Sequence, residues 1–114
     1  MIAVPPWRQI VVEQLELLAS KNEQLEYERN VPRVDITAEM ISGWFDTSYH
    51  PADAHFCSCF SESELAALSA FSAALSDLHA RLPGSNGTVA SWLASPSWRQ
   101  VMNAASQTRA QIAA

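Results

Sequence analysis

The chain has 114 residues, of which 48% are hydrophobic, and this length and composition predict one folded domain over residues 1–114. The formal net charge is −5, and the negative charge is concentrated in residues 1–64, which carry 11 acidic against 4 basic side chains. An acidic surface repels nucleic acid and anionic membranes and attracts basic proteins, so the charge argues against the first two as partners and for a protein partner.

The N-terminal segment, the apolar runs and the spacing of the cysteines predict a cytoplasmic protein. The N-terminal segment MIAVPPWRQ has no basic region before its apolar residues, and two prolines interrupt them, which is unlike a secretory signal. No apolar run approaches the roughly 20 residues that a membrane-spanning helix needs. Cys57 and Cys59 are separated by one residue, which is too close for an ordinary unstrained disulfide, so reduced thiols are expected.

A first helix is predicted from Trp7 to about Glu28, because apolar residues recur there every three or four positions. The other side of this helix is acidic, and several of its carboxylates are three or four positions apart, where like charges repel each other. Such a stripe is commonly a solvated surface, but it also suits a binding face for a basic protein. The acidic residues concerned are Glu13, Glu16, Glu23 and Glu26.

A short second helix and a long loop are expected next. Thr37 is placed to cap a helix that reaches Phe45, with Gly43 in its last turn. Residues 46–59 then show no period and contain Pro51, which predicts an extended surface loop. A loop of this length is uncommon in a small domain unless it has a function.

The central helix is predicted over Phe60–Leu82. Ser61 and Glu64 have the spacing of a capping box, and Pro83 with Gly84 forbids continuation. An apolar stripe runs between these ends. Its members are Leu65, Leu68, Phe71, Leu75, Leu78 and Leu82.

Two further helices complete the predicted fold. Thr88 can cap a short helix, and Ser95 followed by Pro96 is a typical start for a final helix. The inner stripe of that helix is Trp98, Val101, Met102, Ala105 and Ile112. The sequence therefore predicts an all-α fold, a small irregular bundle of three longer and two short helices, with the long loop between the second and third helices.

The predicted loop contains every common type of zinc ligand, and a metal-dependent enzyme is one hypothesis for it. However, H-x4-H and C-x-C do not have the spacing of a structural zinc site. The chain also lacks the G-x-S-x-G, P-loop, dinucleotide-binding and H-E-x-x-H signatures. We therefore expect no catalytic activity and no cofactor. The residues that would bind a metal are Asp46, His50, Asp53, His55, Cys57 and Cys59.

A cluster of carboxylates around an aromatic residue is the favoured candidate for partner binding. Carboxylates and an aromatic ring suit Arg and Lys side chains, through charge-assisted hydrogen bonds and ring contacts. A protein that presents carboxylates at phosphate-like positions can occupy the basic cleft of a nuclease. The predicted binding residues are Glu13, Glu16, Glu23, Glu26, Asp35, Glu39, Asp46, Tyr49 and Asp53.

Aromatic, proline and capping residues form a pattern along the chain: Glu39, Trp44-Phe45-Asp46, Tyr49, Pro51, Phe60-Ser61, Glu64-Leu65, Phe71, Leu82-Pro83, Trp92, Pro96, Trp98, Val101 and Ala105. This pattern resembles that of the small α-helical immunity proteins of bacterial polymorphic toxin systems, including those of contact-dependent growth inhibition. The resemblance implies a cytoplasmic protein that binds and blocks the toxic C-terminal domain of a secreted effector, often a nuclease. These families bind their toxins through different faces, so the resemblance identifies no binding residue. An adaptor or regulatory module that binds another helix or peptide is the main alternative.

Overall fold

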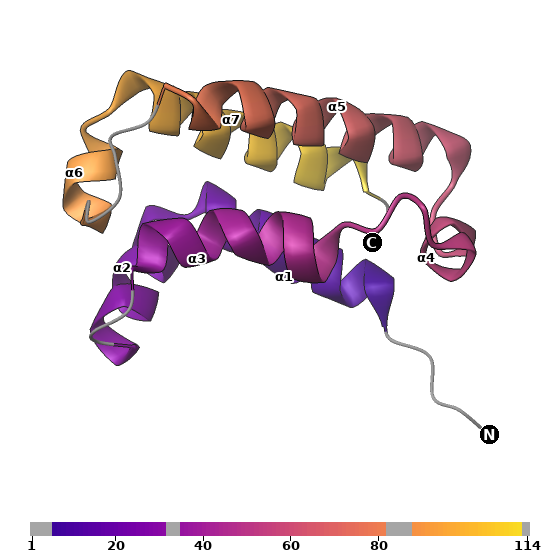
Figure 1. Cartoon of the computed structure of the whole chain (residues 1–114), viewed down its shortest axis with the longest axis horizontal. Coiled ribbons are helices and arrows are strands. Elements are labelled where there is room, and N and C mark those ends of the chain that lie inside the picture. Colours follow the sequence, from indigo (N-terminus) through magenta and orange to yellow (C-terminus); the bar gives the residue numbers. More distant parts are fainter. Residues whose placement is uncertain (1–5, 32–34, 82–87, 113–114) are drawn as a thin grey trace.

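The computed structural model describes residues 6–31, 35–81 and 88–112, and it confirms the prediction of an all-α protein. These residues form helices arranged in two layers (Figure 1). Helices α5 and α7 lie side by side in one layer, and α1, α2, α3 and η1 form the other. The elements are α1 (Trp7–Ala19), α2 (Lys21–Asn30), α3 (Ile36–Ser42), the π-helical segment η1 (Gly43–Ser48), α4 (Ala54–Ser58), α5 (Glu62–His79), α6 (Val89–Leu93) and α7 (Pro96–Gln111).

The hydrophobic core lies between the two layers, where α7 packs against both α1 and α5. Leu15 of α1, Leu75 of α5 and Trp98 of α7 are almost completely buried there. Ala105 is also fully buried, and its small side chain allows the helices to approach closely. The predicted inner stripe of α7 is confirmed in the described residues, except that Met102 is only partly buried.

The capping box that was predicted for the central helix is present. Ser61 Oγ accepts a hydrogen bond from the Glu64 backbone N–H at 3.2 Å, and Glu64 Oε1 accepts one from the Ser61 N–H at 2.9 Å. Two backbone donors that the first turn leaves unpaired are therefore satisfied. The helix itself ends at His79. Leu82, its predicted last residue, and the predicted stop signals Pro83 and Gly84 lie outside the described residues.

The predicted first helix is in fact two helices that meet at Ser20. Ser20 has extended backbone angles, and its Oγ accepts a hydrogen bond from the Glu23 N–H at 3.2 Å, which starts α2. The side-chain amide of Gln24 donates to the carbonyls of Leu17 and Leu18 at 3.0 and 3.1 Å. The Leu17 carbonyl also accepts from the Ser20 N–H at 3.3 Å, so the Gln24 amide adds a second donor there and satisfies the Leu18 carbonyl at the end of α1. The break is therefore stabilised from both sides.

The predicted extended loop over residues 46–59 is also largely helical. The helix begun by α3 continues as η1 to Ser48. Asp53 Oδ1 then accepts hydrogen bonds from the backbone N–H groups of His55 and Phe56, which starts α4. Only residues 49–53 remain as a connection between η1 and α4. At the other end, Asp35 rather than Thr37 caps α3, because Asp35 Oδ1 accepts from the Ala38 N–H at 3.1 Å.

Helices α6 and α7 begin where the sequence predicts. Thr88 Oγ1 accepts a hydrogen bond from the Ser91 N–H at 3.1 Å, and Pro96 occupies the first turn of α7. Ser95 stands at the cap position of α7 but makes no side-chain capping bond. In the described part of the chain, none of the helices has both the length and the apolar character required to cross a bilayer.

Candidate functional site

Several of the predicted binding residues have structural roles within the protein. Asp35 and Asp53 are helix N-caps, so their carboxylates already accept backbone N–H groups. Glu16 Oε1 accepts a hydrogen bond from Arg109 Nε at 3.1 Å, which joins α1 to the end of α7. Glu13 accepts a hydrogen bond from Gln9 one turn earlier in α1. These four carboxylates are therefore at least partly occupied by intramolecular donors.

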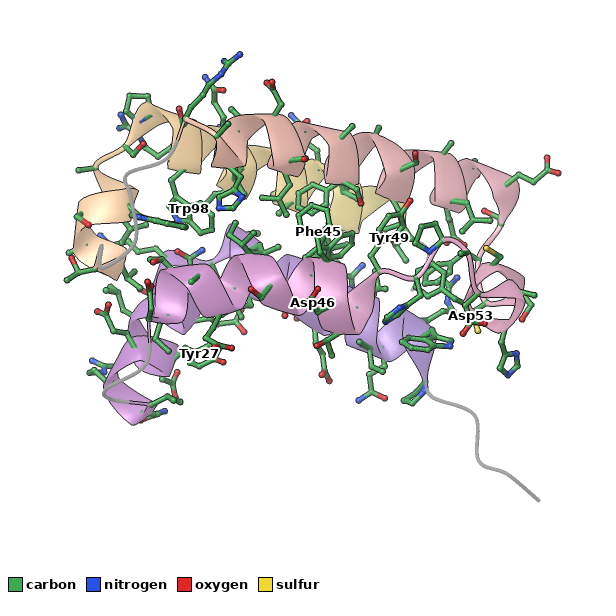
Figure 2. The ribbon with its side chains drawn as sticks, in the orientation of Figure 1. Tyr27, Phe45, Asp46, Tyr49, Asp53 and Trp98 are labelled. Atoms are coloured by element: carbon green, nitrogen blue, oxygen red, sulfur yellow. The ribbon has the colours of Figure 1, made fainter. Side chains whose placement is uncertain are left out.

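Tyr49 belongs to the aromatic packing rather than to an open surface. Its half-buried ring stacks on Trp44 with 5.5 Å between ring centroids, and it meets the edge of Phe56 at 5.8 Å. Trp44 is completely buried, and its indole N–H donates to Ser72 Oγ at 2.9 Å. The structure therefore places Tyr49 in a rigid aromatic cluster beside the start of α4 (Figure 2).

Four of the predicted residues remain as exposed carboxylates: Glu23 and Glu26 on α2, Glu39 on α3 and Asp46 on η1. None of the four side chains makes a hydrogen bond or ion pair with the described residues. All four belong to the layer opposite α5 and α7, where Figure 2 shows Asp46 on η1. We call these four residues the acidic face.

Phe45 lies beside Asp46 in the chain and is 38% exposed, which is unusual for a large apolar side chain in this protein. Exposed aromatic side chains beside charged groups are frequent anchors of protein interfaces. The sequence predicts a short helix that reaches Phe45 but gives no indication that the Phe45 side chain is exposed. The π-helical segment changes the register of the turn that carries Phe45, and this cannot be recognised from helical periodicity.

A cavity of about 240 Å³ lies beside the acidic face, between α1, α2 and the continuous α3–η1 helix. Glu39 contributes to its lining, together with Gln14, Tyr27 and Ser48. The Gln14 side-chain amide donates to the Met40 carbonyl at 2.9 Å. A Cβ atom at Gly43 would lie 3.1 Å from Gln14 Nε2, so glycine leaves room for this contact.

Gln14 and Tyr27 were not among the predicted site residues. For Gln14 the sequence offers no indication, because its partner Met40 lies 26 positions away. For Tyr27 an indication was present, since the residue follows Glu26 and is one helical turn from Glu23. An aromatic ring among carboxylates is the same combination that made Tyr49 a candidate.

An ion pair between Arg8 and Glu64 joins α1 to the start of α5. The guanidinium donates to both carboxylate oxygens, at 2.8 and 3.1 Å, and also to the Cys59 carbonyl at 3.0 Å. Hydrogen bonding to Glu64 is the main factor that raises the pKa of Arg8 above its ordinary value. Glu64 is buried and also completes the capping box, so this pair has a structural role.

The alternative metal site receives little geometric support. His50 Nε2 lies 2.9 Å from the Thr47 carbonyl, and His55 is exposed. The free thiols of Cys57 and Cys59 donate to the carbonyls of Pro51 and His55. Within residues 6–31, 35–81 and 88–112, no three His, Cys, Asp or Glu side chains are grouped as metal ligands.

Searches of protein-family models, curated proteins and solved structures found no significant match to the chain. The resemblance to immunity proteins therefore stays a prediction. What the described residues offer is an exposed set of carboxylates, an exposed phenylalanine and a small polar cavity on one layer of the fold.

Proposed function

We propose that this protein is a non-catalytic inhibitor of the immunity-protein type, which binds a basic toxin domain, such as a nuclease, through the acidic face. The observation that carries the proposal is that Glu23, Glu26, Glu39 and Asp46 are exposed and have no intramolecular partner among the described residues. Carboxylates with no internal donor are available to the Arg and Lys side chains of a partner.

The physical basis of the proposed binding is electrostatic. A set of like charges on one layer produces a field that raises the rate of encounter with a basic surface. The other layer differs in charge, since α5 and α7 carry 3 acidic and 2 basic side chains, whereas α1, α2, α3 and η1 carry 7 acidic and 3 basic ones. A partner with a basic cleft would therefore meet the α2–α3–η1 layer in a preferred orientation. In the cytoplasm, such a complex would cover the cleft before the toxin reaches its target.

The adaptor alternative fits the exposed surface less well. A groove for a partner helix requires a continuous apolar strip several residues long. Among the described residues, the exposed large apolar side chains are Val31 and Phe45, each 38% exposed. A charged partner with one aromatic contact therefore suits this surface better than an amphipathic helix does.

The proposal is tested in two steps. The wild-type protein first captures its partner from a native lysate, and the binding of that partner to the triple variant Glu23→Gln, Glu26→Gln, Asp46→Asn is then measured. Exposed charges contribute little to stability, so this variant should unfold close to the wild-type temperature. It should nevertheless associate with the basic partner about tenfold more slowly than the wild type, because steering is weakened. Mass spectrometry identifies the partner, and surface plasmon resonance measures the association rate at low and high salt.

A matched control raises the net charge by the same amount on the other layer. Ser69→Lys, Ser76→Lys and Gln100→Lys all alter exposed positions of α5 and α7. This control should keep most of the wild-type association rate. Equal slowing by both triple variants would mean that only total charge matters, and it would contradict a binding site on the acidic face. Capture of a partner without a basic domain would contradict the proposed function itself.

A further inference from the structure

The cavity beside the acidic face has polar groups that the fold does not use. Ser48 lines it and is only 2% exposed, yet its hydroxyl makes no hydrogen bond to the described residues. Two other buried hydroxyls behave differently: Ser72 donates to the Leu68 carbonyl at 2.9 Å and Thr108 donates to the Ala104 carbonyl at 2.7 Å. The Ser48 hydroxyl opens into the cavity, so it is available to hydrogen-bond a ligand that enters it.

Tyr27 and Glu39 add an aromatic ring and a negative charge to the same cavity. The Tyr27 hydroxyl also has no hydrogen-bond partner in the part of the chain that is described, and its side chain is half-buried. Glu39 comes from the facing helix α3, and its carboxylate makes no ion pair with the described residues. The described lining contains no Lys or Arg, so the charge of this carboxylate is not neutralised locally.

The remaining walls are apolar and narrow. Leu17 of α1 and Met40 of α3 contribute to the lining, and the volume of about 240 Å³ is smaller than that of typical pockets for drug-sized ligands, which hold roughly 300–1,000 Å³. Such a space suits one long side chain whose aliphatic stem contacts the apolar wall and whose charged end reaches the carboxylate. The planar guanidinium group also stacks on aromatic rings and donates several hydrogen bonds, which an ammonium group does less well.

We infer that this cavity is a binding site for a guanidinium group, supplied by an arginine side chain of the partner. The Glu39 carboxylate would accept charge-assisted hydrogen bonds from the guanidinium group, and the Tyr27 ring would contact its planar face. The Ser48 hydroxyl would accept a further hydrogen bond from it. The arginine source rests on the proposed function, whereas guanidinium binding by the cavity can be measured without any partner.

The first experiment titrates the intact ¹⁵N-labelled protein with Nα-acetyl-arginine amide and follows backbone and side-chain amide signals by NMR. Saturating shifts are expected at the Gln14 side-chain amide and at the backbone amides of Gly43 and Ser48, with a dissociation constant in the millimolar range. Nα-acetyl-citrulline amide has nearly the same shape without the charge, and it should produce no saturating shifts at these positions. Equal binding of both compounds would overturn the inference.

The variant Glu39→Gln keeps the shape of the side chain and removes its charge. It should weaken binding of the arginine compound about tenfold or more, because a charge-assisted hydrogen bond becomes a neutral one. Glu26→Gln is the matched control, since Glu26 is exposed on α2 and does not line the cavity. Weakening of equal size in both variants would indicate general attraction to an acidic surface and would overturn the site.

The experiments distinguish a wrong assignment of the guanidinium site from a wrong proposed function. If the wild-type protein binds the arginine compound and Glu39→Gln does not, the site stands whether or not a basic toxin domain is captured. If a basic partner is captured but the arginine compound does not bind, the acidic face acts without the cavity and this inference is wrong. Tighter binding of the tripeptide glycyl-arginyl-glycine than of agmatine supports a protein source, and the reverse order contradicts it.

Discussion

At the scale of single residues, Gln24 explains more of the structure than its place in the sequence suggests. Its side chain is completely buried, donates to the Leu17 and Leu18 carbonyls and accepts from the Trp98 indole N–H at 3.0 Å. The residue therefore holds the break between α1 and α2 and ties it to α7. Trp98 lies between the two layers near α6, where this hydrogen bond closes the end of the core (Figure 2).

Replacing Gln24 with alanine should lower the free energy of unfolding by about 2–4 kcal/mol. The substitution leaves the Trp98 N–H and the Leu18 carbonyl without their partner in a buried position, removes one of two donors to the Leu17 carbonyl, and also creates a cavity. Chemical denaturation followed by tryptophan fluorescence measures the change. Gln100→Ala, at an exposed position of α7, should stay within about 0.5 kcal/mol of the wild type.

A second substitution separates hydrogen bonding from packing at this position. Gln24→Leu keeps most of the side-chain volume but cannot accept the bond from Trp98. It should therefore also be destabilised, since the indole N–H would stay buried and unpaired. Wild-type stability of Gln24→Leu would show that packing alone matters and would contradict the role given to the hydrogen bonds.

At the scale of elements, the helix starts that depend on local residues could be predicted and the contacts between distant residues could not. The capping box at Ser61 and the start of α6 at Thr88 need only three or four neighbouring residues, and both predictions are confirmed. The break at Ser20 has the same capping spacing with Glu23, but the apolar period continues across it and favoured one long helix. At Ser20 the local capping signal was therefore present, but the apolar period outweighed it in the prediction.

The π-helical segment and part of the candidate site could not be predicted, because they depend on residues far apart in the chain. The contact of Gln14 with the Met40 carbonyl beside η1 spans 26 positions, and the pairing of Glu16 with Arg109 spans 93. Charge and residue type identified Glu39 as a candidate. They could not show that it faces a cavity. The caps at Asp35 and Asp53 are local, but Thr37 and a loop were predicted at these places instead.

Helix α6 offers a prediction at this scale, because its N-terminus is capped from a distant element. Glu28 Oε2 on α2 accepts a hydrogen bond from the Val89 N–H at 2.9 Å. Glu28→Ala should lower the free energy of unfolding by about 1 kcal/mol, and hydrogen–deuterium exchange should rise at the first amides of α6. Glu26→Ala removes the same charge two positions away and should leave exchange in α6 unchanged; a rise in both variants would contradict a specific cap.

At the scale of the whole molecule, the core and the exposed carboxylates lie in different places. The pairing of α5 and α7 and the packing of α7 against α1 provide most of the core, and their inward surfaces are apolar. The α2–α3–η1 side carries the exposed carboxylates, the exposed Phe45 and the polar cavity. Substitutions on the acidic face should therefore affect binding much more than stability, because they leave the core between the layers intact.

The most direct test of the proposed inhibitor is whether it protects cells from the domain that it captures. The toxic domain of the captured partner is expressed together with the wild-type protein, the acidic-face variant or the matched charge control, and growth is measured. The proposal predicts that the wild type and the charge control restore growth, whereas the variant Glu23→Gln, Glu26→Gln, Asp46→Asn restores it poorly although it is folded and present at equal amounts. Full protection by that variant would contradict the acidic face as the inhibitory surface, and no protection by the wild-type protein would contradict the proposed function.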